Sequence, residues 1–217
     1  MDYETLRIIW WLLVGVLLIG FAISDGFDLG VGALLTLVGR NDEQRRVMIN
    51  TVGPHWDGNQ VWFITAGGAI FAAFPLIYAT AFSGLYLALG LTLVALWMRP
   101  LGFDYRSKLE SPRWRQTWDW LLFAGGFVPA LIFGVAFGNM LQGVPFSFDS
   151  TLKATYEGSF FGLLNPYAIL AGLVSVGMLL LHGAVWLQLK TDGVILERAR
   201  SLAALLGLGT AGLFALA

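Results

Sequence analysis

The sequence predicts an all-α protein, a polytopic bundle of transmembrane helices, and three observations support this fold class. Hydrophobic residues make up 57% of the 217 residues and charged residues only 12%, whereas a soluble domain carries about 25% charged residues. Apolar runs of about 20 residues, the length that crosses a bilayer, recur along the chain. The charged residues gather between these runs.

The apolar runs predict six membrane spans in one transmembrane domain. After the first span, Asn41 followed by two acids is typical of a helix start. Gly53-Pro54 predicts a kink in the second helix, and Asn165-Pro166 predicts the start of the fifth span. The predicted spans cover residues 7–38, 44–73, 77–98, 118–141, 165–189 and 201–217.

The segments between the spans are polar. We expect a connection at 101–117, a surface segment at 142–164 and a charged connection at 190–200. The last apolar run is unfinished at Ala217. We therefore expect the chain to be the first half of a longer subunit.

The positive charges predict the orientation of the bundle. Connections on one side hold eleven Lys and Arg residues, and the other side holds only Arg7 and Lys153. Because cytoplasmic loops carry the excess of Lys and Arg, we expect the N-terminus to lie in the periplasm. The eleven are Arg40, Arg45, Arg46, Arg99, Arg106, Lys108, Arg113, Arg115, Lys190, Arg198 and Arg200.

Composition also argues against several function classes. The net charge is −1 and no basic tract is present, so nucleic acid is not an expected partner. The chain has no Cys, and His55 and His182 are its only histidines. The sequence lacks the phosphate-loop, dinucleotide, zinc-protease and serine-nucleophile motifs. We therefore expect no catalytic residue and no metal site in this chain.

Three aspartates, Asp25, Asp28 and Asp57, lie within the first two apolar stretches. A carboxylate inside a membrane costs about 2.5–3.5 kcal/mol, which makes intramembrane acids candidates for function. Residues equally far from the turn of an antiparallel hairpin lie side by side, so a turn near Glu43 places the three acids at one depth. Asp57 lies about 16 Å along the helix from Arg46, well inside the membrane.

The spacing of these residues indicates a proton pathway. Asp25 and Asp28 are three apart and share a helix face. Asp57 shares a face with Gln60, whereas His55, Asn59 and Trp62 form another. Clustered carboxylates at such depth cannot all be ionised, which suits them to gain and lose protons. The expected pathway residues are Asp25, Asp28, Asp57, His55 and Gln60.

Structural roles stay open for several residues. Asp28 could bond to neighbouring hydroxyl or carbonyl groups, and His55 could be a hydrogen-bonded structural histidine. His182, alone in an apolar span, fits a packing role better than haem ligation. We expect Arg99-Pro100 and the segment 104–108 to form a cytoplasmic anchor or a subunit contact.

Long motifs of the chain resemble subunit II of the cytochrome bd quinol oxidases. The resemblance extends over nearly the whole chain. Its motifs are Trp10–Gly15, Ser24–Asp28, His55–Trp62, Arg99–Lys108 and Gly134–Phe146.

The resemblance implies a subunit of an electrogenic quinol:oxygen oxidoreductase in the bacterial inner membrane. Such a complex oxidises ubiquinol and reduces dioxygen to water, and its haems b and d are ligated by subunit I. Subunit II supports subunit I and contributes acids to a proton route from the cytoplasm. Asp25 and Asp57 are the positions carried over, with Asp28 as an additional one, and no haem ligand is carried over to His55 or His182.

Members of that family are nearly twice as long as this chain. The partners expected from the resemblance are subunit I, membrane lipid and ubiquinol as substrate of the complex. A quinone bound in this chain and small single-span accessory subunits stay open.

Two other function classes fit the same acids. A proton-coupled transporter or channel would use them to move protons with a solute or alone. A purely structural membrane subunit would use them to hold helices together. Co-purification with a haem-rich partner separates the oxidase from the transporter, and turnover per assembled complex separates it from the structural subunit.

Overall fold

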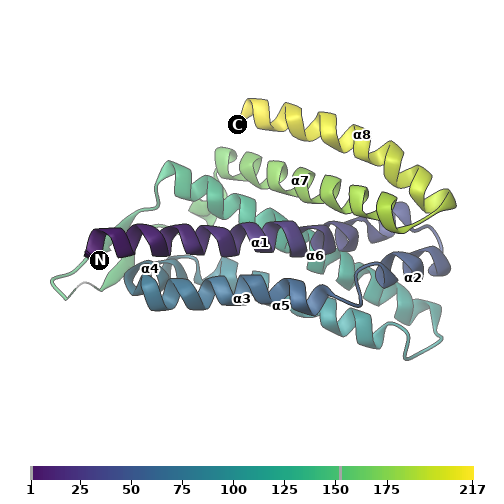
Figure 1. Ribbon diagram of the computed structural model, residues 1–217, viewed down its shortest axis with the longest axis horizontal. Helices are drawn as coiled ribbons and strands as arrows, with labels where there is room; N and C mark the ends of the chain where they lie inside the picture. The colour runs from purple at the N-terminus through teal and green to yellow at the C-terminus, as the bar shows by residue number, and fades with distance from the viewer. Residues whose placement is uncertain (1, 152) are drawn as a thin grey trace.

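One long helix, α1 (Tyr3–Val38), lies at the centre of the bundle and packs against α3, α6 and α7 (Figure 1). The computed structural model describes residues 2–151 and 153–217. The other helices are α2 (Asp42–Asn50), α3 (Trp56–Ala73), α4 (Pro75–Gly84), α5 (Tyr86–Tyr105), α6 (Pro112–Gln142), α7 (Pro166–Lys190) and α8 (Gly193–Leu216). The described part of the chain is therefore largely helical, as the sequence predicts.

The helices form three layers. In Figure 1, α8 and α7 lie along one flank, α1 and α6 occupy the middle, and α3 and α5 lie on the opposite flank. The chain turns at one end of the bundle after α1, α5 and α7. We call this the basic end; it comprises α2 and the connections α5–α6 and α7–α8, at the right of Figure 1.

Two helix starts predicted from sequence are confirmed. The Asn41 side chain caps α2 by accepting a hydrogen bond of 2.8 Å from the backbone N–H of Gln44. Asn165 caps α7 in the same way, with a bond of 2.9 Å from Ala168, and Pro166 is the first helical residue. Such caps satisfy backbone donors that a helix start would otherwise leave unpaired.

The second predicted helix, 44–73, is broken rather than kinked. α2 ends at Asn50, residues 51–55 form turns, and α3 starts at Trp56. Pro54 has no N–H to donate to a preceding carbonyl, and its ring disfavours a continuous helix. The break allows α3 to leave α2 in a new orientation, which decides the side chains that face α1.

The third predicted span, 77–98, is wrong in its bounds. α3 and α4 meet at a bend of 120°, and the next long helix is α5, Tyr86–Tyr105. Phe74 precedes Pro75 and has non-helical dihedral angles, φ −135° and ψ 62°. A residue before proline is sterically disfavoured in the helical region. Among the described helices, α1, α5, α6, α7 and α8 are long and apolar enough to cross a membrane, and the bent pair α3–α4 would be a sixth.

The predicted connections at 101–117 and 190–200 are too long. α6 already starts at Pro112, and α8 starts at Gly193. Charged side chains in these extra turns find partners on other helices: Arg198 on α8 donates hydrogen bonds of 2.9 Å to Val38 O and to Gln44 Oε1. The helices therefore extend past the apolar runs that defined the predicted spans.

The segment between α6 and α7 forms a cover over the end opposite the basic end. Strands β1 (Phe146–Phe148) and β2 (Ala154–Tyr156) pair antiparallel, and η1 (Phe161–Leu163) follows. β2 packs against α4. Asn139 on α6 donates a hydrogen bond of 2.8 Å to Leu163 O, which fastens the segment to the bundle.

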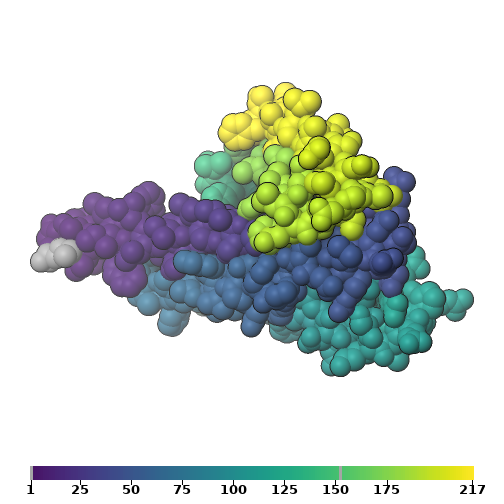
Figure 2. Space-filling view, turned by 45° about the vertical axis from the view of Figure 1, so that its right-hand side comes forward, coloured from purple at the N-terminus to yellow at the C-terminus, as the bar shows by residue number. Residues whose placement is uncertain are grey.

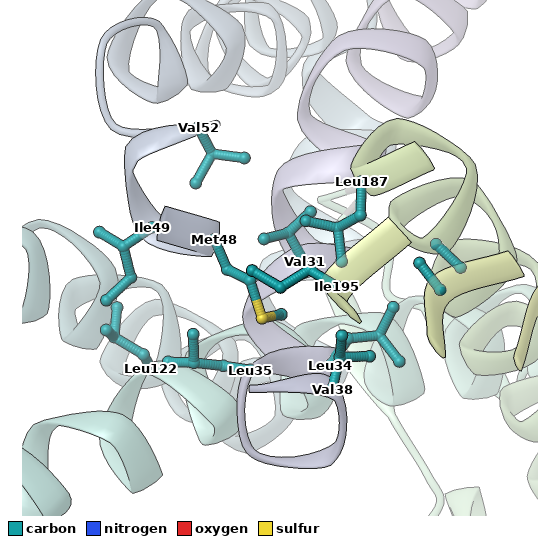
Figure 3. Close-up of a cluster of buried hydrophobic side chains, with 12 residues drawn as sticks. Val31, Leu34, Leu35, Val38, Met48, Ile49, Val52, Leu122, Leu187 and Ile195 are labelled. Atoms are coloured by element: carbon teal, nitrogen blue, oxygen red, sulfur yellow. The ribbon is translucent and has the colours of Figure 1, made fainter. Parts of the chain in front are cut away.

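The largest buried apolar cluster lies toward the basic end. Figure 3 shows Met48 of α2 surrounded by Val31 and Leu35 of α1 and by Ile195 of α8. Ile49 and Val52 belong to the same cluster. Since α2 contributes only nine residues, these buried side chains account for its place across the end of the bundle.

Much of the outer surface is apolar. Trp11, Leu205 and Phe214 are each about two-thirds or more exposed, and Figure 2 shows the N-terminal part of α1 projecting from the rest of the molecule. A soluble monomer does not expose apolar surface on this scale. Together with the long apolar helices, this surface identifies a multi-pass membrane protein.

Candidate functional site: a buried acid cluster

A buried ion pair joins α1 to α5. Arg99 Nη1 lies 2.8 Å from Asp25 Oδ2, and Arg99 Nη2 lies 2.6 Å from Asp25 Oδ1. The Asp25 side chain is fully buried, and that of Arg99 is 2% exposed. A planar guanidinium that binds both oxygens of a carboxylate forms a strong, directional pair. The pair compensates much of the cost of placing each charge away from water.

Asp28, one helical turn further on, belongs to the same cluster. Asn59 Nδ2 on α3 donates a hydrogen bond of 2.8 Å to Asp28 Oδ2, and Arg99 Nη2 lies 3.8 Å from the same oxygen. Asp28 Oδ1 is buried and accepts no hydrogen bond from any described residue. We call Asp25, Asp28, Asn59 and Arg99 the acid cluster. It holds two carboxylates and one cation.

Glycines on α6 make room for this cluster. A Cβ atom on Gly125 would lie 3.0 Å from Arg99 Cγ and 2.9 Å from Ala95 O. A Cβ on Gly126 would lie 2.6 Å from Ala33 N on α1. Because neither glycine carries a side chain, α6 approaches both α1 and α5 closely, and the Arg99 side chain reaches α1 between them.

Asp57 lies outside the acid cluster. Its side chain is exposed on α3, in contrast to buried Asp25 and Asp28. The Asp57 side chain has no hydrogen bond to Asp25 or Asp28 in the described part of the chain, and the expected common depth of the three acids stays a prediction. The break at 51–55 turns α3 so that Asn59 and Trp62 face α1: a Cβ on Gly20 of α1 would lie 2.6 Å from Trp62.

Gln60 follows Asp57. Both belong to the face of α3 that the sequence separates from the face holding Asn59. Gln60 is half-buried and has no side-chain hydrogen bond to another described residue. The structure therefore joins two of the five predicted pathway residues, Asp25 and Asp28, and adds Arg99 and Asn59 to them.

His55 lies beside an aromatic stack. Phe27 stacks on Trp186 with ring centroids 3.9 Å apart, and His55 meets the two rings edge-on at 5.8 and 5.5 Å. Trp186 Nε1 donates a hydrogen bond of 3.2 Å to Thr51 O in the break between α2 and α3. Through these contacts, residues 51–55 pack against α1 and α7.

A second charge network lies at the basic end. Arg106, with a side chain 1% exposed, bonds Asp119 Oδ1 at 2.5 Å and Asp42 Oδ1 at 2.6 Å. Arg45 binds Asp119 at 2.9 Å, and Arg115 binds Asp42 at 2.6 Å. The network ties α2 and the end of α5 to the start of α6. The predicted anchor at 104–108 is thus, at Arg106, an internal connection rather than an exposed one.

Asp42 is half-exposed and lies outside the membrane-spanning segments. Its partial burial alone would raise the pKa of the carboxyl, but the hydrogen bond and charge of Arg106, with those of Arg115, outweigh this effect. The pKa of Asp42 is therefore lowered from its ordinary value of 3.8.

Comparison with known proteins identifies the family. Residues 6–217 match the family model described as cytochrome bd terminal oxidase subunit II. The chain belongs to this family.

Relatives support the assignment. The chain is 62% identical over 216 residues to cytochrome bd-I ubiquinol oxidase subunit 2 of Escherichia coli (strain K12). The aligned region covers 100% of the chain and 57% of that relative. It is 64% identical over 200 residues, 92% of the chain and 53% of the relative, to the probable cytochrome oxidase subunit 2 of Haemophilus influenzae. Cytochrome bd ubiquinol oxidase subunit 2 of Bacillus subtilis is 40% identical over 199 residues, 92% of the chain and 58% of the relative.

The chain thus spans a little over half the length of the curated relatives that it matches. Membership of the bd oxidase subunit II family and the long apolar helices make it a multi-pass protein of the bacterial inner membrane.

Haem is the cofactor that a bd oxidase implies, and the two histidines of this chain lie against aromatic rings. Both rings pack edge-on against Phe27, at 5.8 Å for His55 and 5.7 Å for His182. Within residues 2–151 and 153–217, no group of three His, Cys, Asp or Glu side chains is placed to hold a metal ion.

The sequence offered a signal for the partner of Asp25. Arg99 and Arg106 are seven residues apart, two helical turns, so they point to the same side of one helix. An arginine on the inner side of an apolar helix predicts a buried acid that pairs with it. Both arginines lie beyond the predicted third span, 77–98, whereas α5 continues to Tyr105 with Pro100 inside it.

Proposed function

We propose that the chain is part of subunit II of a bd-type terminal quinol oxidase, a complex that oxidises ubiquinol and reduces dioxygen to water. In this proposal haems b and d are held by the partner subunit I. The chain supports that subunit and contributes acids to a proton route from the cytoplasm. The family assignment and the names of the relatives support the reaction of the complex.

The acid cluster is the observation that carries the proton role. Two buried carboxylates share one guanidinium, so the cluster has a formal charge of −1 when both acids are ionised and becomes neutral on taking up one proton. A low-dielectric interior favours the neutral state. Such a group can hold a proton and release it, as a relay requires.

The proposed route enters from the basic end. Arg99 is buried in α5, so ten of the thirteen Lys and Arg residues remain near the turns of that end. This count favours a cytoplasmic basic end and a periplasmic N-terminus. Asp57 is exposed on α3, and we propose that it passes protons toward the cluster together with Gln60 and His55.

A structural role is the second candidate, and the Asp25–Arg99 pair favours it. A bidentate buried pair between α1 and α5 also fixes helix positions. In that case substitutions in the cluster would lower assembly and leave turnover per assembled complex unchanged.

The experiment uses the full-length subunit assembled with its partner. We expect the purified complex to show the absorption spectrum of b- and d-type haems and, in liposomes, to take up protons from the cytoplasmic side during quinol oxidation. Asp28→Asn should slow proton uptake per assembled complex, whereas Asn165→Ser, which retains an N-cap far from the cluster, should not. Unchanged proton uptake in Asp28→Asn would contradict the relay, and absence of a haem-bearing partner would contradict the oxidase.

A further inference from the structure

A small cavity adjoins the acid cluster. It has a volume of about 10 Å³ and lies between α1, α2, α5 and α6. Its polar lining comes from Asp28 and Arg99, and apolar side chains with one glycine, Gly32, form the rest. A cavity of about this volume can hold one water molecule where polar groups reach it, and Asp28 and Arg99 are the polar groups here.

The two oxygens of Asp28 differ in their surroundings. Oδ2 accepts a hydrogen bond of 2.8 Å from Asn59, while the buried Oδ1 receives none from the described part of the chain. Buried carboxylate oxygens in native proteins are almost always hydrogen-bonded, to protein or to ordered water. Asp28 itself lines the cavity, so its carboxylate can reach a molecule held there.

Asp25 is in the opposite situation. Both of its oxygens are taken by Arg99, at 2.8 and 2.6 Å. A guanidinium has five N–H donors, and Arg99 uses two atoms, Nη1 and Nη2, for Asp25. Donors of Arg99 remain for the oxygen of a water molecule in the cavity that it lines.

The apolar part of the lining limits the site to one molecule. Val31, Leu35, Ile49 and Val52 surround the cavity, and all four are at most 4% exposed. Figure 3 shows Val31 and Leu35 on α1 opposite Ile49 and Val52 on the α2 side. These apolar side chains leave Asp28 and Arg99 as the charged groups that a molecule in the cavity can meet.

We propose that the cavity binds a single water molecule that donates a hydrogen bond to Asp28 Oδ1, and that Asp28 rather than Asp25 is the proton-exchanging acid of the cluster. The second part rests on the proposed function. An excess proton that reaches this water passes to Oδ1: an O–H bond breaks on the hydronium ion and forms on the carboxylate, leaving neutral water and a neutral carboxyl. Asp25 stays paired with Arg99 through both of its oxygens.

A pair of glycine substitutions on α1 tests the site. Gly32→Ala places a methyl group at the cavity wall, 3.2 Å from Leu122 O. Gly26→Ala is the matched control: its methyl group would lie 3.1 Å from Leu179 Cδ2, an equally close contact on the face toward α7. Both variants add one methyl group to the same helix, and only Gly32→Ala adds it to the wall of the cavity.

The readout is a cryo-EM map of the whole oxidase complex at a resolution that shows ordered water. We expect water density within hydrogen-bond distance of Asp28 Oδ1 in the wild type and in Gly26→Ala, and none in Gly32→Ala. If Gly32→Ala does not assemble, Val52→Ile adds one methylene to another wall of the cavity and should give the same loss. Wild-type maps without this density, or density that persists in both cavity variants, would overturn the hydration site.

Infrared difference spectroscopy on the same complexes tests the proton exchange. The band assigned to Asp28 by its loss in Asp28→Asn should respond to transfer into D2O in the wild type and in Gly26→Ala, and respond much more slowly in the cavity-filled variant. A response that is equally fast without the water would overturn exchange through it. If the water is present but Asp28→Asn takes up protons as fast as the wild type, the proposed relay is overturned and the hydration site is not.

Discussion

Arg99 on α5 holds Asp25 on α1 in a bidentate ion pair, with bonds of 2.8 and 2.6 Å, and lies 3.8 Å from Asp28. One cation thus serves two acids that lie a helical turn apart. This relationship joins the stability of the bundle to the charge of the acid cluster.

Arg99→Leu should destabilise the protein strongly. It leaves Asp25 and Asp28 buried without a cation, and breaking a buried pair from one side costs about 3–5 kcal/mol. Thermal unfolding of the purified complex, followed by tryptophan fluorescence, measures the loss. Arg7→Leu is the control, because its pair with Glu4 is more than half exposed and such pairs contribute about 0–1 kcal/mol. Equal effects of the two substitutions would contradict this account.

Gly183→Ala should disrupt the contact between α1 and α7. A Cβ at this position would lie 2.6 Å from Val31 N and 2.7 Å from Gly30 Cα, so the backbones must move apart. Overpacking of this kind costs about 1–3 kcal/mol. The yield of assembled complex and its unfolding temperature report the effect. Gly209→Ala on α8 meets no atom within 4 Å and should lower neither quantity, since Ala favours a helix more than Gly does. A comparable loss in Gly209→Ala would show that crowding at the contact between α1 and α7 is not the cause.

Asp57→Asn should change transport of protons without changing stability. The side chain is exposed and lies outside the acid cluster, and substitutions at such positions usually alter stability by less than about 0.5 kcal/mol. Under the proposed function, proton uptake per complex should fall while assembly and unfolding temperature stay at the wild-type level. A loss of assembly with normal turnover would instead place Asp57 in a structural contact with the partner.

The network at the basic end should make stability depend on pH. The pKa of Asp42 is lowered from 3.8 by Arg106 and Arg115 against the opposing effect of burial. A carboxyl with a lowered folded-state pKa stabilises the protein above its unfolded-state pKa, and this contribution is lost as pH falls through the folded-state value. The unfolding temperature of the wild type should therefore drop more steeply below about pH 4 than that of Asp42→Asn.

Glu43→Gln provides the comparison for this prediction. Glu43 is the exposed neighbour of Asp42 and forms no ion pair with another described residue. Its pH profile should follow the wild type. Profiles of Asp42→Asn and wild type that coincide at acidic pH would show that the ion pairs with Arg106 and Arg115 do not contribute to stability.

Local signals predicted local structure well. The caps at Asn41 and Asn165 depend on side chains that bond backbone groups three residues away, and both are present as expected. The break at Pro54 and the restart at Pro75 follow from the missing N–H of proline. Span ends were less accurate, because Arg106 and Arg198 extend helices past the apolar runs through bonds to other helices.

The sequence by itself determined that the protein is a helical membrane bundle with acids buried near the middle of its first helix, because hydropathy, caps and prolines act over a few residues. Only the tertiary structure decided which residues meet those acids. Arg99 lies 74 positions from Asp25, and Asn59 rather than Asp57 reaches Asp28 because the break before α3 sets its rotation. Such pairings depend on helix packing and orientation, which glycines far apart in the chain make possible and which no short stretch of sequence specifies.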